Sequence, residues 1–327
     1  MRIIGVVSGK NSGCGYHRIT HPLMNMEADV YITNVLKEED FEKGCDVLFY
    51  NRLIAHNTKE EINEWKKKYK FKIILDIDDS WILDYFHILK SIWDYHNIPN
   101  QIINNIIEAD VVTTTHERLA DLISAYNKSV YILPNAISGA EQFSIQRIPS
   151  EIVRLFWSGS ITHRKDIEIL RNPMKRIGGL NIATILAGYQ ENQQDWSEMV
   201  SAFTNGLKIK GMVYKGVEAD KYYHFYAIAD ICLIPLVDTS FNSMKSNLKV
   251  LEAANLGIPC VVSNVNPYKD LPVSYVNSQK DWFNHVKDLV NDSAMRHELG
   301  MNLKNYCEKN YNFVKINEKR KQIFHQR

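Results

Sequence analysis

Short apolar runs alternate with stretches of helical periodicity in the first part of the chain. Thr58 and Glu61 form a capping box ahead of a helix that is expected to extend to about Tyr69. Residues 117–124 carry a second amphipathic helical pattern, with Thr115 as its predicted N-cap. The apolar runs are predicted as buried strands over residues 3–7, 46–50, 72–76, 110–114 and 130–133. This alternation predicts a parallel α/β sheet.

The same rhythm restarts after residues 138–150, which lack periodicity and form the predicted linker. Helices are expected from about Lys165, over residues 221–228 and over residues 247–256, with Gly257 as the terminating residue. Further strands are predicted over residues 153–157, 182–187, 208–213, 230–235 and 259–263, and residues 281–327 are predicted to be helical and polar. Two successive Rossmann-like halves follow from this pattern.

Composition agrees with two ordinary globular domains. The chain has 327 residues, 45% of them hydrophobic and 24% charged, and its formal net charge is +1. At about 150 residues per domain, this length predicts two domains. The composition excludes a disordered or fibrous protein. The near-zero net charge argues against bulk attraction to nucleic acid or anionic lipid, but it leaves a local basic groove open.

Cysteine usage and the N-terminus favour a cytoplasmic protein. The five cysteines are scattered without a CxxC pair, and Cys232 and Cys260 lie in apolar runs where buried free thiols are expected. The first apolar run stops at Ser8, which is too short for a signal peptide. No apolar stretch approaches the roughly 18 residues of a transmembrane helix, so any membrane contact would be peripheral.

Ligands of open parallel sheets bind beyond the carboxyl ends of the strands, so the residues that follow each strand are the candidates for chemistry. After the first strand, glycines at a helix start favour an anion. The alternative is a tight turn with an exposed Arg18. The candidate ligand-binding residues of the first half are Gly15, Tyr16, His17, Arg18 and Asp79.

Acidic residues end the predicted strand over residues 72–76. Asp76, Asp78 and Asp79 could bind a divalent metal or act as a general base. The alternative is a cluster of helix-capping acids. No metal is expected, because no partnering histidine or further acid is identifiable. Asp78 is the candidate catalytic carboxylate.

Two loops of the second half suit a phosphate. After residues 153–157 come small residues and then His163, Arg164 and Lys165; the alternative is a solvated helix start. The helix start near residue 247, flanked by Lys245 and Lys249, would seat a diphosphate; the alternative is an amphipathic helix with surface lysines. The candidates for diphosphate binding are Gly159, Ser160, His163, Lys245, Ser246, Asn247 and Leu248, and Glu252 is the candidate for ribose.

Several stretches together carry a family resemblance: residues 229–235, 245–253 and 257–263, residues 110–112 with 133–135, and residues 157–159 with Lys165. In these stretches the chain resembles GT-B, family-4-type retaining glycosyltransferases. It implies two Rossmann-like domains that face each other across a cleft, with a C-terminal helix that crosses back. The implied ranges are an acceptor domain over 1–148, a nucleotide-sugar domain over 149–310 and the returning helix over 311–327. The five candidates of the first half, Gly15, Tyr16, His17, Arg18 and Asp79, would then lie on the acceptor side.

Site roles also follow from the resemblance. The second of the family's two glutamates matches Glu252, which would bind the donor ribose, whereas the first falls on Met244. The arginine after the phosphate-loop glycine is replaced by Ser160, and Arg164 or His163 would compensate. A methionine cannot hydrogen-bond a sugar hydroxyl, so this contact to the donor sugar would be missing. Residues 13–18 and 76–81 look like those of a divergent branch of the family.

The implied function is retaining, metal-independent transfer from a nucleoside diphosphate sugar, with a UDP-sugar favoured and no other cofactor. Lys165, Arg164 and Lys245 would stabilise the leaving diphosphate, and Asp78 or Asp79 would orient the acceptor hydroxyl of a glycan, lipid or protein. One alternative is transfer to hydroxymethylated DNA bases through a basic cleft of Lys10, Arg18 and Arg52. Another is a non-catalytic nucleotide-binding protein. A nicotinamide-dependent oxidoreductase is disfavoured, because no GxGxxG follows a strand.

Overall fold

The computed structural model describes residues 1–9, 13–137, 145–191, 194–208 and 211–326. The chain forms two compact units. Unit 1 comprises Met1–Asn135, Met244–Ser246 and Val314–Arg327, and unit 2 comprises Ala136–Ser243 and Asn247–Phe313.

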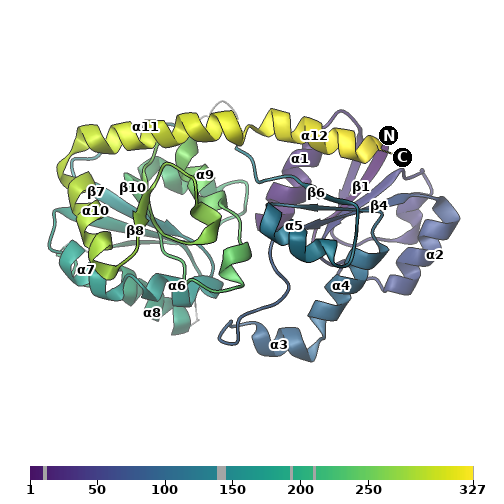
Figure 1. Cartoon of the computed structure of the whole chain (residues 1–327), viewed down its shortest axis with the longest axis horizontal. Helices are drawn as coiled ribbons and strands as arrows, with labels where there is room; N and C mark the ends of the chain where they lie inside the picture. Colours follow the sequence, from purple (N-terminus) through teal and green to yellow (C-terminus); the bar gives the residue numbers. More distant parts are fainter. Residues whose placement is uncertain (10–12, 138–144, 192–193, 209–210, 327) are drawn as a thin grey trace. The chain divides into compact units, whose positions relative to one another are not determined.

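Unit 1 is built on a parallel sheet that has six strands within the described residues, in the order β2-β1-β3-β4-β5-β6 (Figure 1). The strands are β1 (Arg2–Val6), β2 (Asp29–Thr33), β3 (Val47–Asn51), β4 (Lys72–Ile77), β5 (Val111–Thr114) and β6 (Val130–Ile132). The predicted strands of this half are confirmed. The half-exposed edge strand β2 was not predicted from the sequence, because its pattern lacks a buried run.

Helices cover both faces of this sheet. They are η1 (Gly15–Thr20), α1 (His21–Met24), η2 (Glu38–Phe41), α2 (Lys59–Tyr69), α3 (Lys90–Tyr95), α4 (Ile98–Glu108), α5 (Glu117–Ser124) and α12 (Phe313–His325). Strand residues that alternate along the chain pack against α2, α4 and α5 on one face, while η1, α1 and α12 cover the other (Figure 1). The period of two in a strand sends successive side chains to opposite faces.

Local signals account for two helix starts in unit 1. The capping box of α2 is present, with the Glu61 amide donating to Thr58 Oγ1 at 3.2 Å and the Thr58 amide donating to Glu61 Oε2 at 2.8 Å. The predicted cap of α5 is wrong by one residue: His116 occupies the N-cap, and its Nδ1 accepts from the Leu119 amide at 3.3 Å. An imidazole nitrogen here does what the Thr115 hydroxyl was expected to do.

The last helix of the chain packs on unit 1, as the fold class predicts. The Asn317 side chain donates to the carbonyl oxygens of Pro22 and Asn25, both at 3.0 Å. The Phe324 ring meets Phe49 of β3 edge-on, with centroids 4.9 Å apart. α12 therefore completes one face of the unit 1 sheet.

Unit 2 repeats the plan with a parallel sheet of six strands among the described residues, in the order β12-β11-β10-β7-β8-β9. Its strands are β7 (Val153–Ser158), β8 (Ile182–Tyr189), β9 (Met212–Lys215), β10 (Ile231–Ile234), β11 (Cys260–Ser263) and β12 (Ser274–Val276). Residues 138–144 of the predicted linker lie outside the described residues, and residues 145–150 belong to no helix or strand. β12 was not predicted.

The helices of unit 2 again flank the sheet on both faces. They are η4 (Ile161–His163), α6 (Arg164–Glu168), α7 (Arg171–Ile177), α8 (Gln194–Phe203), η5 (Tyr222–Ile228), η6 (Asn242–Met244), α9 (Leu248–Asn255), η7 (Asn266–Tyr268), α10 (Gln279–Asn291) and α11 (Ser293–Asn310). The segment predicted as an α-helix over 221–228 is a 3₁₀ helix. Gly257 follows α9 with a φ of 64°, the left-handed conformation expected of a terminating glycine.

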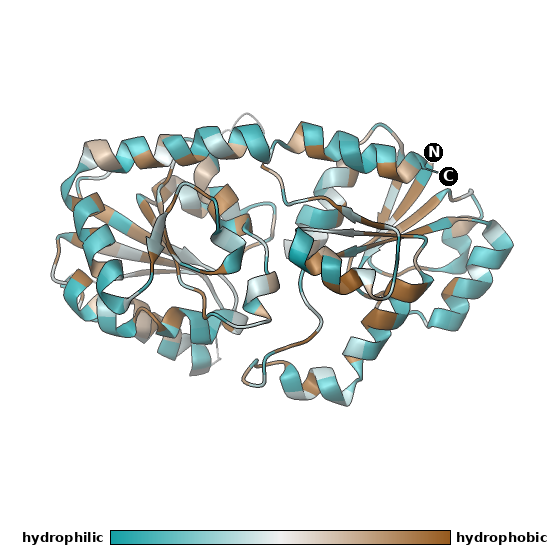
Figure 2. Ribbon diagram, viewed as in Figure 1, coloured by the Kyte–Doolittle hydropathy of each residue, from teal (hydrophilic) through white to brown (hydrophobic). Residues whose placement is uncertain are grey.

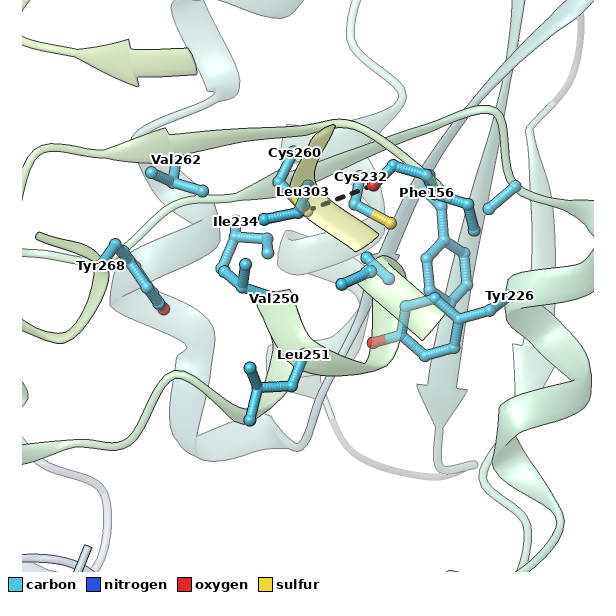
Figure 3. Close-up of a cluster of buried hydrophobic side chains, with 14 of the residues drawn as sticks. Phe156, Tyr226, Cys232, Ile234, Val250, Leu251, Cys260, Val262, Tyr268 and Leu303 are labelled. Atoms are coloured by element: carbon cyan, nitrogen blue, oxygen red, sulfur yellow. Dashed lines mark hydrogen bonds between the residues drawn. The ribbon is translucent and has the colours of Figure 1, made fainter. Parts of the chain in front are cut away.

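The apolar core of unit 2 beneath α9 contains both cysteines of the predicted strands. Cys232 and Cys260 are free thiols, 2% and 1% exposed, in the apolar cluster of Figure 3. The Tyr226 ring packs edge-on against Phe156 in the same cluster, with centroids 4.7 Å apart. Hydropathy colouring shows the same distribution, with apolar strands and polar outer helix faces (Figure 2). No helix in the described ranges is both long and apolar enough to cross a membrane.

Candidate functional site

Asp76, at the end of β4, is held in a buried ion pair with Arg18 of η1. The Arg18 Nε and Nη2 atoms donate to the two carboxylate oxygens at 2.9 and 2.8 Å, and Nη1 donates to the Leu133 carbonyl oxygen and to Asn135 Oδ1. Thr113 Oγ1 also donates to the carboxylate, at 2.6 Å. Arg18 is 1% exposed. The expectation of Arg18 on the acceptor side is corrected: its guanidinium is occupied inside unit 1.

Asp78 is paired with Arg52, which follows β3. Arg52 Nε and Nη2 donate to Asp78 Oδ1 at 2.9 and 2.8 Å, and Asn51 Nδ2 donates to the same oxygen at 3.0 Å. Burial alone would raise the pKa of Asp78, but the Arg52 charge and the hydrogen bonds hold this pKa well below its usual range. A carboxylate that stays ionised in this way is a weak general base, so a proton-accepting role for Asp78 lacks support.

Arg52 itself is in a left-handed backbone conformation, with a φ of 56°. This conformation is costly for a residue with a Cβ, and it is retained where surrounding contacts fix it. The Arg52 amide donates to the Asp76 carbonyl oxygen at 3.0 Å, and Asn105 Nδ2 donates to the Arg52 carbonyl oxygen at 3.0 Å. In the sequence, Arg52 stands out only by its position after a predicted strand.

Asp79 is the more accessible acid of this strand end. Its Oδ2 atom lies 3.7 Å from Arg52 Nη2 and 3.5 Å from Lys245 Nζ, and its side chain is 23% exposed. The segment Met244–Ser246 belongs to unit 1, where His116 Nε2 lies 2.8 Å from the Met244 carbonyl oxygen. Asn135 Nδ2 donates to Ser246 Oγ at 2.8 Å. Lys245 and Ser246 thus share a polar cluster with Asp79.

The remaining acceptor-side candidates lie on or beside the π-helix η1. Gly15 begins η1 and is buried, so it opens a helix rather than a tight turn. The Tyr16 ring stacks on His21 with centroids 5.5 Å apart and meets His17 edge-on at 5.2 Å. Burial lowers the pKa of His17 to about 3 and, together with the nearby Arg320 charge, that of His21 to about 4. Both imidazoles are therefore neutral near pH 7.

In unit 2, Gly159 follows β7 at a place where no side chain fits. A Cβ there would meet the Trp157 ring at 2.9 Å and Lys249 Nζ at 3.1 Å. Lys249 Nζ lies over the Trp157 ring, 5.2 Å from its centroid. Gly188, at the end of β8 with a φ of 109°, packs on the Gly159 carbonyl oxygen so closely that its own Cβ would also collide. Two glycines thus make room for a lysine ammonium beside a partly exposed backbone.

His163 of the same loop is positioned by Asp166. His163 Nδ1 lies 2.7 Å from Asp166 Oδ2, while Asp166 Oδ1 accepts from the Val237 amide at 2.9 Å and from Asn242 Nδ2 at 3.1 Å. Burial would raise the pKa of Asp166, but the contact with His163 and the other hydrogen bonds lower it. Asp166 therefore connects α6, through hydrogen bonds, to the loop that follows β10. Sequence reasoning missed it, because its partners lie 71 and 76 residues away.

The two cations after His163 differ in availability. Arg164 forms an ion pair with Asp195 and lies 3.9 Å from Glu198, both on α8. Lys165 is exposed. Ser160 Oγ lies 2.6 Å from Thr162 Oγ1. Lys165 is therefore better placed for a phosphate than Arg164, whose charge is compensated by two carboxylates.

Glu252 lies in the interior of unit 2. It is 4% exposed, and the Tyr226 hydroxyl donates to its Oε2 atom at 2.8 Å. Ser158 Oγ lies 3.4 Å from the Tyr226 hydroxyl, which links Glu252 to the end of β7. Burial raises the pKa of Glu252 well above its ordinary value of 4.5. Asn247 is the N-cap of α9 and Leu248 its first residue, one turn ahead of Glu252.

The predicted residues therefore fall into two groups. Unit 2 brings together Gly159 and His163 with Trp157 and Lys249, which the sequence placed in different motifs. Unit 1 gathers Asp78 and Asp79 with Lys245. Within the described part of the chain, no cluster of three or more His, Cys, Asp or Glu side chains is arranged to hold a metal ion.

Most of unit 2 matches a known protein family. Residues 153–292 match the family described as "Glycosyl transferases group 1". This segment, which makes up most of unit 2, is thus similar to group 1 glycosyl transferases. The matched segment contains the Gly159 loop, Asp166, α9 and Glu252. A search of curated protein sequences gave no match.

Solved structures show the fold of the whole chain. Sucrose-phosphate synthase from Thermosynechococcus elongatus is 14% identical with a TM-score of 0.73, over 99% of this chain and 98% of that one. HepE from Anabaena, in complex with UDP-glucose, is 10% identical with a TM-score of 0.67, over 98% of both chains. An alpha-glucosyltransferase in complex with UDP and a 13-mer DNA containing an HMU base is 12% identical with a TM-score of 0.67, over 100% of both chains. The chain has the GT-B fold.

Proposed function

We propose that this protein transfers a sugar from a nucleoside diphosphate sugar to an acceptor hydroxyl, and that unit 2 binds the donor. The observation that carries the proposal is the set of groups around Gly159. Partly exposed backbone, the Lys249 ammonium and the His163 imidazole converge there next to the start of α9. Backbone amides at a helix start together with cationic side chains favour a diphosphate.

Charge on the leaving diphosphate sets the chemical requirement. When the bond between the sugar and the diphosphate breaks, negative charge grows on the phosphate oxygens, and preorganised donors stabilise it most effectively. Lys249, Lys165 and the first amides of α9 supply such donors without a metal ion. The proposed reaction proceeds with retention of anomeric configuration, and the departing phosphate guides the acceptor hydroxyl to the same face of the sugar.

Glu252 is the proposed ribose ligand. A protonated carboxyl group can both donate and accept a hydrogen bond, which matches a ribose hydroxyl. The Tyr226 hydroxyl fixes its orientation. HepE was solved with UDP-glucose, and this supports a UDP-sugar as the first donor to test.

Asp79 and Lys245 are the proposed acceptor-side groups in unit 1, because Asp79 is less enclosed than Asp76 and Asp78. The acceptor is proposed to be a glycan, a lipid or a protein. A DNA acceptor occurs in the alpha-glucosyltransferase complex. The basic cleft that this alternative requires lacks support here, because Arg18 and Arg52 are neutralised by Asp76 and Asp78, and Lys10 lies outside the described residues.

Donor binding can be tested by isothermal titration with UDP, GDP and ADP, followed by transfer or hydrolysis assays with the matching sugar nucleotides in the presence of EDTA. Lys249→Met should weaken binding of the preferred diphosphate roughly 10- to 100-fold, the loss expected for one charged hydrogen bond. Lys280→Met, at an exposed position of α10, is the matched control and should leave binding unchanged. Failure of all three diphosphates to bind would overturn the proposal.

A non-catalytic nucleotide-binding protein is the second candidate, favoured by Met244 at the position of the family's first glutamate. The Met244 side chain packs against the apolar core of unit 1 and offers no polar group to a sugar. This candidate predicts tight diphosphate binding without hydrolysis or transfer of any sugar nucleotide. Measured turnover would eliminate it, and the anomeric proton couplings of the product would show whether configuration is retained.

A further inference from the structure

A pocket of about 270 Å³ lies in unit 1, and Asp76, Asp78 and Asp79 do not line it. It is lined by β3, by the loop that follows β3, by the start of α2, by β4 and by one face of α4. This volume is slightly below the range of about 300–1,000 Å³ that is usual for drug-sized ligands. The pocket therefore suits a ligand the size of a single ring.

The floor of the pocket is apolar and rigid. Tyr50 of β3, Ile62 of α2 and Ile73 of β4 line it, and they are 4%, 7% and 1% exposed. All three side chains belong to the apolar cluster between the sheet and α2, α4 and α5. Packed core side chains hold fixed conformations, so this floor is preformed.

The walls of the pocket carry an unusual number of carboxamides: Asn57, Asn63, Gln101, Asn104 and Asn105. Each carboxamide can donate and accept hydrogen bonds. The Asn57 Oδ1 atom is buried, and no group in the described part of the chain donates a hydrogen bond to it. A buried acceptor in this state is costly, and rotation of the Asn57 amide toward a ligand hydroxyl in the pocket would satisfy it.

Charge at the pocket is balanced. Lys59 Nζ lies 2.7 Å from Glu108 Oε1, and these are the only charged side chains that line the pocket among the described residues. A phosphorylated ligand would find no uncompensated cation among them. The Gln101 and Asn105 side-chain amides already donate to the His96 and Arg52 carbonyl oxygens. A purely apolar ligand would still leave Asn57 Oδ1 without a donor, which disfavours such a ligand as well.

We propose that this pocket binds a neutral sugar ring. A pyranose has hydroxyls that donate and accept around its edge and apolar C–H groups on its faces, which match the amide walls and the apolar floor. All the residues that line the pocket belong to unit 1, and none of them is among the proposed donor groups of unit 2. Sugar binding there requires neither nucleotide nor transfer, so this inference goes beyond the proposed function and can stand if that function fails.

The test is saturation-transfer NMR and titration of the full-length protein, without nucleotide, against neutral methyl glycosides and the corresponding trisaccharides. Asn104→Phe fills the pocket and should abolish binding, whereas Asn100→Phe, on the same helix but not lining the pocket, should not. Asn57→Leu removes the buried acceptor; it should weaken binding at least tenfold while the melting temperature stays equal or rises.

The outcomes separate the alternatives. Binding of the free monosaccharide alone, or of the trisaccharide through one terminal ring, supports the proposal. Which of the two binds shows whether the ligand is a free sugar or the end of an oligosaccharide. Absence of binding by every neutral saccharide overturns it, as does binding that Asn104→Phe leaves intact. Preferential binding of a sugar phosphate or a hydrocarbon also overturns it. Saccharide binding in a protein that binds no nucleoside diphosphate would contradict only the proposed function.

Discussion

Arg18 and Asp76 form a two-bonded ion pair, with nitrogen–oxygen distances of 2.9 and 2.8 Å, although the two side chains are only 1% and 0% exposed. The same guanidinium reaches the Leu133 carbonyl oxygen and Asn135 beyond β6. The Arg18 side chain therefore contacts both the carboxyl end of β4 and the residues that follow β6. These contacts give Arg18 a structural role, rather than the contact with an acceptor that the loop sequence suggests.

Arg18→Met should lower the free energy of unfolding by about 3–5 kcal/mol, because it leaves the Asp76 carboxylate buried without its counter-ion. Urea denaturation measures this loss. Lys37→Met is the control: Lys37 pairs with Glu39 at 3.2 Å where the two side chains are 63% and 67% exposed, and such pairs contribute only about 0–1 kcal/mol. Equal effects of the two substitutions would contradict the structural role of Arg18.

The positions that the sequence predicted well depend on neighbours in the chain. The capping box of α2 and the termination of α9 at Gly257 each require residues within one helical turn, so their spacing is visible in the sequence. Buried strands are visible because both faces of a parallel sheet are covered and their residues are apolar. The exposed edge strand β2 lacks this signal.

The candidate site was predicted less completely, because its geometry comes from distant pairs. Arg18 meets Asp76 across 58 positions, and Asp166 meets Asn242 across 76. A motif shows that Arg18 follows a strand, but not that its charge is neutralised. Likewise, Arg164 and Lys165 are equivalent in the sequence, whereas the structure places two acids of α8 beside Arg164 and leaves Lys165 exposed.

Gly188→Ala should disturb the groups around Gly159 that are proposed to bind the nucleotide-sugar donor. The φ of 109° at Gly188 is unfavourable for alanine, and the new Cβ would collide with the Gly159 carbonyl oxygen. We expect a lower melting temperature and at least tenfold weaker diphosphate binding, measured by titration. Gly13→Ala is the control, since a Cβ there meets nothing within 4 Å. Unchanged diphosphate binding in Gly188→Ala would show that the Gly159 loop does not hold the donor.

Glu252→Gln should change how stability depends on pH. Because burial raises the pKa of Glu252 above 4.5, the folded protein keeps a proton that the unfolded chain loses as the pH rises past this value. The free energy of unfolding of the wild type therefore falls with rising pH, by up to about 1.4 kcal/mol per unit from this group, until the pH passes the raised pKa. Glutamine does not titrate, so the variant should gain stability relative to the wild type as the pH rises.

Urea denaturation between about pH 5 and pH 8 measures this difference. In Glu252→Gln, the new side-chain amide can still accept from the Tyr226 hydroxyl, so the substitution tests the proton rather than the fold. Glu298→Gln, on the exposed surface of α11, is the matched control, and its stability curve should run parallel to that of the wild type. Parallel curves for Glu252→Gln as well would mean that Glu252 is ionised in the folded protein.

Asp166→Asn should loosen the connection between α6 and the loop after β10. The carboxylate accepts from Val237 and Asn242 and contacts His163, and asparagine keeps the shape but loses the charge. Loss of charged hydrogen bonds should cost about 2–3 kcal/mol at neutral pH. Since the folded pKa of Asp166 is lowered, its contribution is present above the unfolded value of about 3.8 and is lost as the pH falls through the folded pKa. The wild type and the variant should therefore converge in stability in acid.

Hydrogen exchange at the Val237 amide measures the opening of this loop directly. The exchange rate should increase in Asp166→Asn. It should not increase in the control Asp195→Asn, in which the ion-pair partner of Arg164 loses its charge instead. Equal exchange rates in the two variants would show that Asp166 does not hold the loop.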